Sequence, residues 1–356
     1  MLACALAALG LLPPVAAGQA FDPGREDIAA FIAEVAHEHG FEPGPLAATF
    51  AQAESRPAIL TAIAKPAERT LTWDEYRARF LIERRIQRGV AIGSERRAEL
   101  EQAQAASGVP IDALLAIVGV ETFYGENTGK HRVIDALATL AFDYPPRAPY
   151  FRGELEQFLL MAREERLDPL APLGSYAGAM GVPQFMPTSF RNWAVDGDAD
   201  GRRDLWGDWA DVFASVGNYL KVHGWRAGEP VMVQADAAGA DLAGLDVGKA
   251  SLAETVGSLR KRGIRFETNL PADAPAMLVG LPVAFGSEFR VGFTNFYAIT
   301  RYNRSLMYAS AVSDLADAIG ATRSGLPLPA SAGPVAPAAP EPPKPSSGWS
   351  TTTPGA

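Results

Sequence analysis

Residues 109–121 place the strongest restriction on how this chain can fold. Their sequence, VPIDALLAIVGVE, is apolar on nearly every side of a helix. A helix that is apolar all round belongs in a protein core, so the run predicts a buried helix. Pro110 falls near its first turn, where proline is tolerated, and Glu121 falls at its C-terminal end.

Glu121 is an unusual residue for the end of such a run. A carboxylate beside that much hydrocarbon is costly unless something pairs with it or uses it. Desolvation and the negative end of the helix macrodipole are both expected to raise its pKa. A protonated acid near neutral pH is what cleavage of a glycosidic bond requires, because the leaving sugar oxygen must receive a proton. The alternative is a structural glutamate paired with an arginine or lysine, and one residue does not decide between them.

Helical periodicity covers most of the remaining chain. Helices are predicted over residues 27–40, 73–92, 133–144, 150–167, 211–225 and 303–320. Short β-like runs are predicted over residues 230–233, 265–267, 276–285 and 289–300. Ser251 and Glu254 have the spacing of a capping box, which predicts a helix start between these runs. The predicted fold class is α+β, mainly α, and 356 residues suit one large domain with an inserted subdomain or two domains.

The two ends of the chain differ in composition from the rest. Residues 1–20 are apolar and small and predict a signal peptide for export to the periplasm, although the basic residues that usually begin such a peptide are absent. Cys4 stands at the front of this run, whereas an acylated cysteine should follow it, so a lipoprotein anchor is not expected. Residues 323–356 are rich in Pro, Ala and Ser and predict a disordered tail. No later segment is long and apolar enough to span a bilayer.

Charge and residue inventory exclude several classes of function. The net charge of −9 disfavours broad electrostatic binding of nucleic acid or anionic lipid. Cys4 is the only cysteine, which excludes thiolate catalysis and cysteine-based zinc sites in the mature chain. The four histidines are scattered, and the sequence contains no HExxH, Walker or GxSxG motif.

The acidic stretch VDGDADGRRDLWGD has the spacing of a calcium-binding EF-hand loop, with Gly201 at its sixth position. The predicted ligands are Asp196, Asp198, Asp200, the carbonyl of Arg202, and Asp204. The twelfth position, where a glutamate is expected, holds Gly207, and Asp208 comes one residue late. The loop could bind weakly, use Asp208 after a shift, or fill the gap with water. The alternative is an Asp/Gly turn that binds no metal.

A glycine-rich stretch, GSYAGAMGVPQFMPTSF, runs from residue 174 to residue 190. Its small residues would bring the backbone close to a ligand, and Ser175 and Gln184 supply neutral hydrogen-bonding groups suited to a sugar. The alternative is a set of turns without a ligand. Further on, Tyr302 and Asn303 end the β-like run, where an ordinary strand–turn junction would also explain them.

Three long stretches, residues 119–165, 174–225 and 296–305, closely resemble the lytic murein transglycosylase B family, glycoside hydrolase family 103. The resemblance runs from about residue 21 to residue 320 and is densest over residues 116–225. It implies a lysozyme-like catalytic domain over residues 21–322, with a β-containing insertion at about residues 229–300. The tail lies outside the resemblance.

The resemblance also implies an activity and a set of site residues. The family cleaves the β-1,4 bond between N-acetylmuramic acid and N-acetylglucosamine in peptidoglycan and forms a 1,6-anhydromuramoyl product. Glu121 would be the single acid/base, without a cofactor for catalysis. Ser175 and Gln184 would orient the substrate or its acetamido group. The cleft would be lined by Tyr219, Tyr302, Asn303 and Tyr308. The acidic loop would be the family's calcium site, and the partners would be glycan strands and unspecified cell-wall enzymes.

Two other functions stay open at this point. A catalytically inactive relative would bind peptidoglycan without cleaving it. A lysozyme-type hydrolase would need a second carboxylate or a positioned water, and Asp135 and Asp143 are the nearest candidates.

Overall fold

The structure is a computed structural model that describes residues 18–64 and 71–328. Residues 1–17 of the predicted signal peptide and residues 329–356 of the predicted tail lie outside the described residues. Gln19 and Ala20, the last two residues of the predicted signal peptide, form a short strand, β1, that pairs with Ser55 and Glu54.

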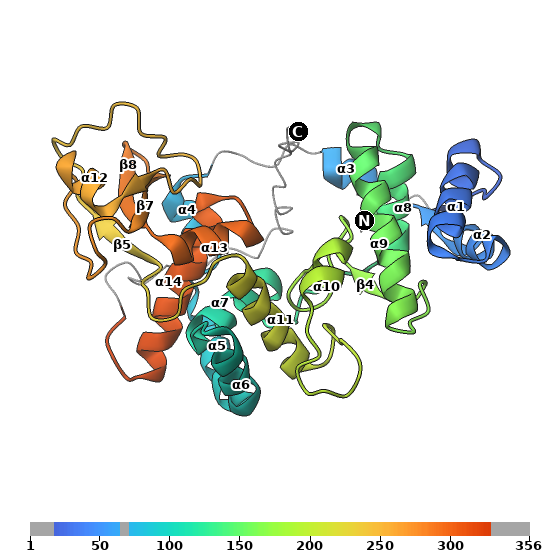
Figure 1. Ribbon diagram of the computed structural model, residues 1–356, viewed down its shortest axis with the longest axis horizontal. Coiled ribbons are helices and arrows are strands. Elements are labelled where there is room, and N and C mark those ends of the chain that lie inside the picture. Colours follow the sequence, from blue (N-terminus) through green and yellow to red (C-terminus); the bar gives the residue numbers. More distant parts are fainter. Residues whose placement is uncertain (1–17, 65–70, 329–356) are drawn as a thin grey trace, which may run out of the picture.

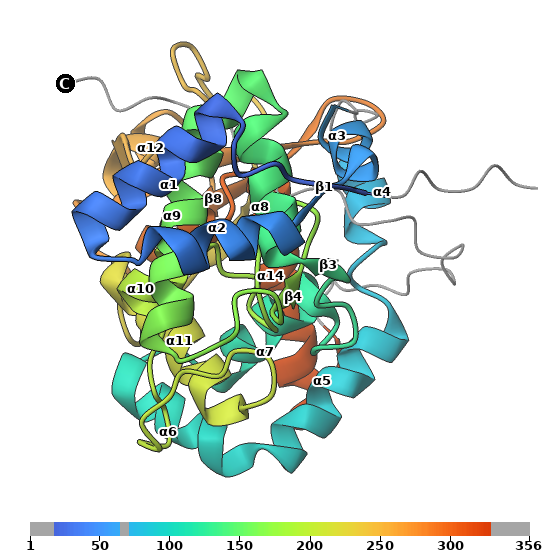
Figure 2. The same cartoon turned by 90° about the vertical axis from the view of Figure 1, so that its right-hand side faces the viewer.

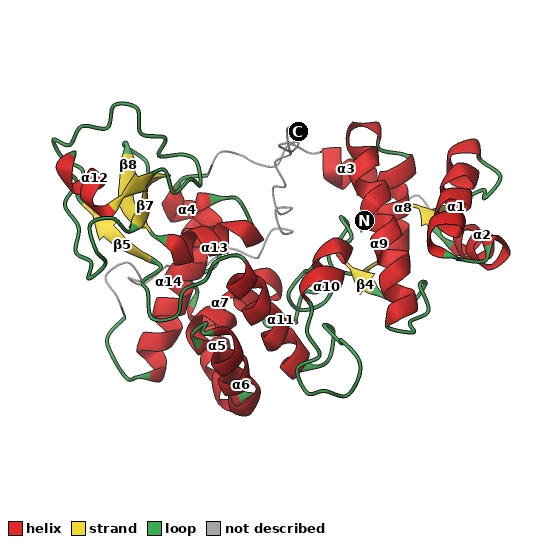
Figure 3. Cartoon of the chain, viewed as in Figure 1, coloured by secondary structure: helices red, strands yellow, loops and turns green. Residues whose placement is uncertain are grey.

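The described chain is mainly helical (Figure 3). Its α-helices are α1 (Glu26–His39), α2 (Pro43–Gln52), α3 (Pro57–Ala64), α4 (Trp73–Arg77), α5 (Glu83–Glu95), α6 (Arg97–Ser107), α7 (Ile111–Thr122), α8 (Val133–Phe142), α9 (Ala148–Glu164), α10 (Pro187–Trp193), α11 (Trp209–Val222), α12 (Val256–Lys261), α13 (Thr294–Tyr302) and α14 (Leu306–Arg323), with a 3₁₀ turn η1 (Pro145–Arg147). Its strands are β1 (Gln19–Ala20), β2 (Glu54–Ser55), β3 (His131–Arg132), β4 (Leu173–Gly174), β5 (Met232–Ala235), β6 (Glu254–Thr255), β7 (Pro275–Pro282) and β8 (Ser287–Gly292).

Helix α7 lies in the interior, as its apolar sequence predicts. Every residue from Ala113 to Val120 is buried, and the helix packs against α5, α6, α11 and α14. Pro110 is the N-cap residue, one position before the helix begins. In Figure 1, α7 lies in the middle of the molecule, between the sheet at one end and α1 and α2 at the other. Figure 2 shows α1 and α2 in front of α8 and α9.

The largest sheet is a separate small layer that packs on the helical part. Its antiparallel strands are ordered β5-β8-β7-β6. Because side chains alternate along a strand, β7 contributes Met277 and Val279 to the main core and Ala276 and Leu278 to a second, smaller core. One face of this sheet therefore packs on the main core, and the other face packs on the second, smaller core.

The predicted strand over residues 289–300 is wrong in its second half. Strand β8 ends at Gly292, and helix α13 begins at Thr294. The β-branched and aromatic residues in this stretch favour a strand by intrinsic propensity. Tertiary contacts override that preference, since Phe296 and Ile299 face the core from one side of a helix. The side chain of Asn295 also bonds to the backbone of Arg226 and fixes the start of α13.

The capping box predicted from Ser251 and Glu254 is also wrong. The N-cap of α12 is Thr255, whose hydroxyl accepts from the N–H of Ser258 while the Ser258 hydroxyl accepts from the N–H of Thr255. Glu254 instead pairs with Ala276 in the sheet. The helix start is therefore set by strand β6, which the sequence pattern did not reveal.

The helical run predicted over residues 73–92 is divided into α4 and α5. The guanidinium of Arg85, which is 3% exposed, lies in this break. It donates to the carbonyls of Arg79 and Phe80 and, through Nε, to the carbonyl of Gly119 in α7 at 3.1 Å. A buried charged side chain thus satisfies carbonyl groups that the interrupted helix leaves unpaired.

A buried ion cluster joins the sheet to the helical core. Asp314 of α14 accepts from Arg290 of β8, Nη1 to Oδ1, at 2.5 Å, and from Arg77 of α4, Nε to Oδ2, at 2.9 Å. The side chains of Arg290 and Asp314 are 3% and 2% exposed. Asp314 therefore holds three elements together in a region shielded from water.

Among residues 18–64 and 71–328, no single helix has the length and apolarity needed to cross a membrane. Within these described ranges, α6 and α7 taken together reach that length and composition, with a bend of 109° between them.

Candidate active site

Glu121 occupies the last turn of α7, and its side chain is half-buried. The helix ends in two consecutive residues with left-handed backbone, Phe123 (φ 52°) and Tyr124 (φ 57°). Such a conformation is unfavourable for bulky residues and tends to persist at functional sites, where surrounding contacts enforce it. The N–H of Tyr124 donates to the carbonyl of Val118 at 3.1 Å, so the chain turns away immediately after the glutamate.

Tyr308 makes a direct contact with the carboxyl group of Glu121. Its hydroxyl donates to Oε1 of Glu121 at 2.6 Å. Tyr308 lies in the first turn of α14 and is 3% exposed. Burial, followed by the charge of Glu121, raises the pKa of Tyr308 well above its ordinary value. The tyrosine therefore remains a neutral hydrogen-bond donor that fixes one oxygen of the carboxyl group.

A cluster of aromatic rings continues from this contact. Tyr302 is buried at the end of α13, and its hydroxyl donates to the carbonyl of Pro183 at 2.6 Å. Burial, and after it the charge of Glu121, raises the pKa of Tyr302. The ring of Tyr219 lies 4.8 Å from that of Tyr302, and Phe185 packs against both. Burial raises the pKa of Tyr219 to about 12, and its hydroxyl donates to the carbonyl of Arg301.

The glycine-rich loop is folded by its own backbone and side-chain bonds. The hydroxyl of Ser175 accepts from the N–H of Ala179 at 3.0 Å. Gln184 has left-handed backbone (φ 54°), and its Nε2 donates to the carbonyls of Gly181 at 2.9 Å and Thr128 at 3.0 Å. The bond to Thr128 attaches this loop to the segment that follows α7.

Asn303 follows the last residue of α13 and is half-buried. Its Oδ1 accepts from the N–H of Ser305 at 3.0 Å, which shapes the turn into α14. Asn303 therefore lies at a helix–turn–helix junction, whereas the sequence pattern had predicted a strand end.

Some of the predicted cleft residues contact one another through their side chains. The side chains of Ser175, Gln184 and Asn303 instead bond to main-chain groups. Glu121 contacts Tyr308, and Tyr302 contacts Tyr219 and also the loop residue that precedes Gln184. Ser175 is engaged within its own loop. The residues that are brought together come from α7 (Glu121), α11 (Tyr219), α13 (Tyr302) and α14 (Tyr308), and Tyr302 links them to the glycine-rich loop.

The two carboxylates considered as partners of Glu121 serve another purpose. Asp135 is 1% exposed and accepts from Arg56, from Arg132 and from the N–H of Glu54. Asp143 accepts from Arg25 and from the hydroxyl of Ser55. Both carboxylates attach the N-terminal segment to α8.

The acidic loop is held by hydrogen bonds between its aspartate side chains and its own backbone. The carboxylate of Asp196 accepts from the N–H groups of Asp200 at 3.1 Å and Gly201 at 2.8 Å. Gly201 has a φ of 90°, a conformation that glycine adopts without strain. The loop backbone therefore wraps around the carboxylate of its first residue.

Asp211, which the sequence pattern missed, supplies a further carboxylate to this loop. One ligand oxygen from each of Asp196, Asp198 and Asp211 lies within 4.8 Å of the others. Asp211 lies in the first turn of α11, is 2% exposed, and accepts from the N–H groups of Gly197 and Asp204 at 2.6 Å. Burial raises the pKa of Asp211 to about 6, although the two hydrogen bonds by themselves lower it. Three converging carboxylates are the oxygen ligands that a hard cation such as Ca²⁺ prefers.

The other acids of the loop have different positions. Asp204 accepts from the N–H groups of Trp206 and Gly207 and is not among the three clustered carboxylates. Asp208 caps α11 by accepting from the N–H of Ala210. Asp200 accepts from the N–H of Arg202. Gly207, at the twelfth loop position, precedes Asp208, the N-cap of α11, and Asp211 of that helix brings its carboxylate close to Asp196 and Asp198.

Comparison with known proteins identifies the family. A family model described as "Transglycosylase SLT domain" matches residues 24–317. The chain is 40% identical over 302 residues to "Membrane-bound lytic murein transglycosylase B" of Escherichia coli strain K12, and the match covers 82% of each protein. The chain belongs to the lytic murein transglycosylase B family.

Solved structures of lytic transglycosylases share the fold of this family member. The soluble lytic transglycosylase SltB1 from Pseudomonas aeruginosa is 46% identical, with a TM-score of 0.79 over 84% of this chain and 99% of that one. Slt35 of Escherichia coli in complex with calcium is 38% identical, with a TM-score of 0.77 over 86% of this chain and 97% of that one. SltB3 from Pseudomonas aeruginosa in complex with NAG-anhNAM-pentapeptide is 33% identical, with a TM-score of 0.72 over 82% of this chain and 78% of that one. These matches confirm the predicted fold class.

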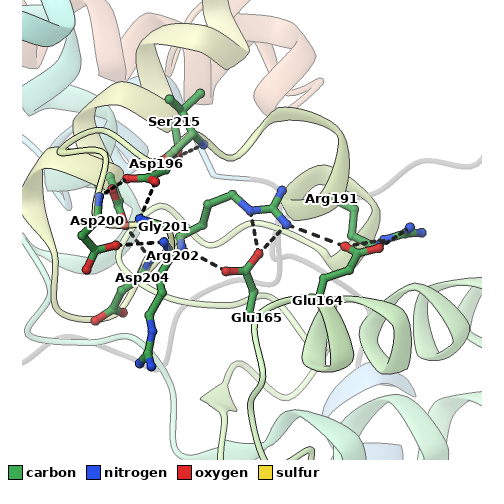
Figure 4. A network of polar contacts seen from close by, with 12 residues as sticks. Glu164, Glu165, Arg191, Asp196, Asp200, Gly201, Arg202, Asp204 and Ser215 are labelled. Carbon is green, nitrogen blue, oxygen red and sulfur yellow. Dashed lines mark hydrogen bonds and ion pairs between the residues drawn. The ribbon is translucent and has the colours of Figure 1, made fainter.

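In this transglycosylase the acidic loop is fastened to two helices of the catalytic domain (Figure 4). The N–H and the guanidinium of Arg203 both donate to Glu165, at the C-cap of α9. The adjacent Glu164 pairs with Arg191 of α10 at 2.6 Å. Arg203 also pairs with Glu164 at 3.6 Å, so the loop is bound to the end of α9 and, through Glu164, to α10.

Proposed function

We propose that the protein is a peptidoglycan lytic transglycosylase in which Glu121 is the single catalytic acid/base. The observation that carries this proposal is the setting of the carboxyl group. It sits at the end of a buried helix, half-buried, with one oxygen held at 2.6 Å by the hydroxyl of Tyr308. A fixed, partly desolvated carboxyl group suits proton donation to a glycosidic oxygen.

The reaction uses this one group twice. Protonated Glu121 gives its proton to the oxygen that leaves C1 of the muramoyl residue, and the C1–O4 bond breaks. The acetamido oxygen of the same sugar stabilises C1 as an oxazolinium-like species. The carboxylate of Glu121 then removes the proton from the 6-hydroxyl, whose oxygen bonds to C1 and closes the 1,6-anhydro ring. No water is consumed, so no second carboxylate is required, unlike the two-acid hydrolases.

The substrate is assigned to peptidoglycan on chemical grounds and on the relative SltB3, whose structure contains NAG-anhNAM-pentapeptide. In this proposal Ser175 and Gln184 orient the sugar and its acetamido group. Tyr219, Tyr302 and Asn303 line the cleft. Gln184 is held from both sides by main-chain carbonyls, so its position is set before a glycan arrives.

Digestion of purified sacculi tests the activity. Mass spectrometry of the released fragments should find 1,6-anhydromuramoyl ends. Reducing ends would instead identify a lysozyme-type hydrolase, and the absence of released fragments would identify an inactive glycan-binding protein.

We also infer export to the periplasm, where peptidoglycan is accessible. The apolar composition of residues 1–20 supports this inference. Recovery of the mature chain only from the cytoplasm after cell fractionation would contradict it. The same location would allow contact with other cell-wall enzymes.

Replacement of Tyr308 by Phe is expected to lower kcat by about 10- to 100-fold, because a hydrogen bond to a charged group contributes roughly 1.5–3 kcal/mol. The hydroxyl holds Oε1 of Glu121, and the phenyl ring keeps the packing. Turnover of soluble glycan fragments measures the effect. Tyr297→Phe, at a half-buried tyrosine on α13, serves as the control and should retain activity. Equal activity of Tyr308→Phe and the wild type would remove Tyr308 from the site.

We further propose that the acidic loop binds Ca²⁺ through Asp196, Asp198, Asp200, the carbonyl of Arg202, and Asp211. The clustering of three carboxylates supports the proposal, and the relative Slt35 was solved in complex with calcium. When bound, the ion would neutralise the mutual repulsion of these acids and fix the loop.

Ca²⁺ is expected to raise the melting temperature of the wild type, since a ligand that binds only the folded state stabilises it, by about 2.7 kcal/mol at about 100-fold excess over Kd. Asp211→Asn should lose most of this calcium-dependent shift. Differential scanning fluorimetry with EDTA and with CaCl₂ measures it in each variant.

Asp204→Asn is the matched control. Its side chain accepts from the N–H groups of Trp206 and Gly207, and an asparagine oxygen can still do so. This variant should keep the shift. A loss of the shift in Asp204→Asn with full retention in Asp211→Asn would restore the ligand set expected from the loop spacing and reject the one proposed here.

A further inference from the structure

Thr122, the residue that follows Glu121, is fully buried and makes bonds in two directions. Its hydroxyl donates to the carbonyl of Val182 at 2.8 Å, while the carbonyl of Val118, one turn back in α7, lies farther away at 3.3 Å. The same hydroxyl accepts from the N–H of Gly125 at 3.0 Å. The shorter contact therefore leaves the helix and reaches the glycine-rich loop.

Val182 is bound on its opposite side as well. Its N–H donates to the carbonyl of Leu205 at 2.7 Å, and Leu205 belongs to the acidic loop. The residue before it, Gly181, has a φ of 68°, and a Cβ there would lie 2.4 Å from that carbonyl oxygen. The close approach of the two segments thus requires glycine, and the main chain of Val182 has little freedom to move.

Consecutive loop residues each bind one element of the site. The carbonyl of Val182 accepts from the hydroxyl of Thr122, and the carbonyl of Pro183 accepts from the hydroxyl of Tyr302. The side-chain amide of Gln184 donates to the carbonyl of Thr128. Through these three bonds the loop that carries Gln184 is aligned with the end of α7 that carries Glu121. Of the three, only the bond of Thr122 comes from the residue next to the proposed acid.

We propose that Thr122 is a positioning residue, whose hydroxyl fixes the carboxyl group of Glu121 relative to the glycine-rich loop through Val182. The inference rests on the proposed function. A catalytic group acts efficiently only when the bound geometry is correct, and displacement of about 1 Å can cost about 100-fold in rate. Loss of the hydroxyl should therefore impair the chemical step more than substrate binding.

The test compares Thr122→Val, which keeps the shape without the hydroxyl, with Thr122→Ser, which keeps the hydroxyl. Thr122→Val is expected to lower kcat by about 10- to 100-fold with little change in KM. Thr122→Ser should restore kcat to near the wild-type value. Thr122→Ala gives a second, smaller variant without the hydroxyl, and all variants are assayed well below the unfolding midpoint of the least stable one.

Thr139→Val is the matched control for lost stability. Thr139 of α8 is also fully buried, and its hydroxyl accepts from the N–H of Arg56 at 3.0 Å. The same substitution there should lower the melting temperature and leave kcat near that of the wild type. A role of Thr122 limited to stability would make both valine variants lose kcat in proportion to their melting temperatures, which would overturn the inference.

Two further results would also overturn it: wild-type kcat in Thr122→Val, or an equal loss in Thr122→Ser. The proposed function fails separately, if the wild type itself releases no anhydromuramoyl products from sacculi. A wild type that makes these products beside an equally active Thr122→Val variant would reject only the positioning role.

Discussion

Glu121→Gln is expected to reduce release of anhydromuramoyl products by about 100- to 10,000-fold or more, the range that a positioned general acid or base contributes. The amide has no proton to donate to the leaving oxygen and cannot later remove one from the 6-hydroxyl. Since one group serves both steps, both are impaired together.

The variant should nevertheless fold normally. The hydroxyl of Tyr308 donates to Oε1 of Glu121, and the amide oxygen of glutamine can accept the same bond. An unchanged melting temperature together with lost turnover would separate catalysis from stability.

Glu126→Gln is the control for this experiment, because it makes the same chemical change five residues further along. Glu126 is exposed and pairs with Arg84 at 2.7 Å on the surface. This variant should remain as active as the wild type. Wild-type-like turnover by Glu121→Gln would reject the assignment of the acid/base.

Asp314→Ala is expected to lower the free energy of unfolding by about 3–5 kcal/mol, the usual cost of breaking a buried ion pair by removing one partner. The substitution leaves Arg290, which is 3% exposed, and Arg77 without the carboxylate that both contact. Because these arginines come from β8 and α4, the sheet should lose its attachment to α14. Urea denaturation of the variant and the wild type measures the difference.

Glu101→Ala provides a matched control at an exposed pair. Glu101 accepts from Arg97 on α6, where the two side chains are 52% and 75% exposed. Exposed ion pairs contribute little to stability because water screens them, so this variant should unfold close to the wild type. Equal effects of the two substitutions would show that Asp314 is not a structural anchor.

The sequence predicted the central features of the fold because they depend on local pattern. The apolar run before Glu121 predicted α7 and its burial, and the helical periodicity over residues 27–40 predicted α1, whose C-cap residue Gly40 adopts the left-handed conformation. The β-like run over residues 276–285 predicted β7. In each case the period of the side chains and the terminating residue lie within one short segment.

The errors arose where distant segments decide the local conformation. Residues 293–300 have the composition of a strand, yet α13 forms because its apolar side faces the core and Asn295 binds the backbone of Arg226. The break between α4 and α5 is stabilised by the buried guanidinium of Arg85, which also reaches α7. Neither contact can be inferred from spacing within the segment itself.

The site divides in the same way. Glu121 and the spacing of the loop aspartates were visible in the sequence, since each depends on a short pattern. Asp211 was missed because it belongs to α11 and joins the loop only when that helix packs beside it. Thr122 was missed because its hydroxyl points out of its own helix toward Val182, sixty residues away in the chain.

The sequence alone therefore determined which helix is central, which acid terminates it, and the family to which the chain belongs. These properties follow from side-chain period and from motifs confined to single segments. The tertiary structure alone decided which oxygen of Glu121 accepts from the hydroxyl of Tyr308, which acid of α11 lies beside Asp196 and Asp198, and which side chains join the sheet to the core. Hydrogen bonds and ion pairs depend on distances between atoms far apart in the chain, and only the packed fold sets those distances.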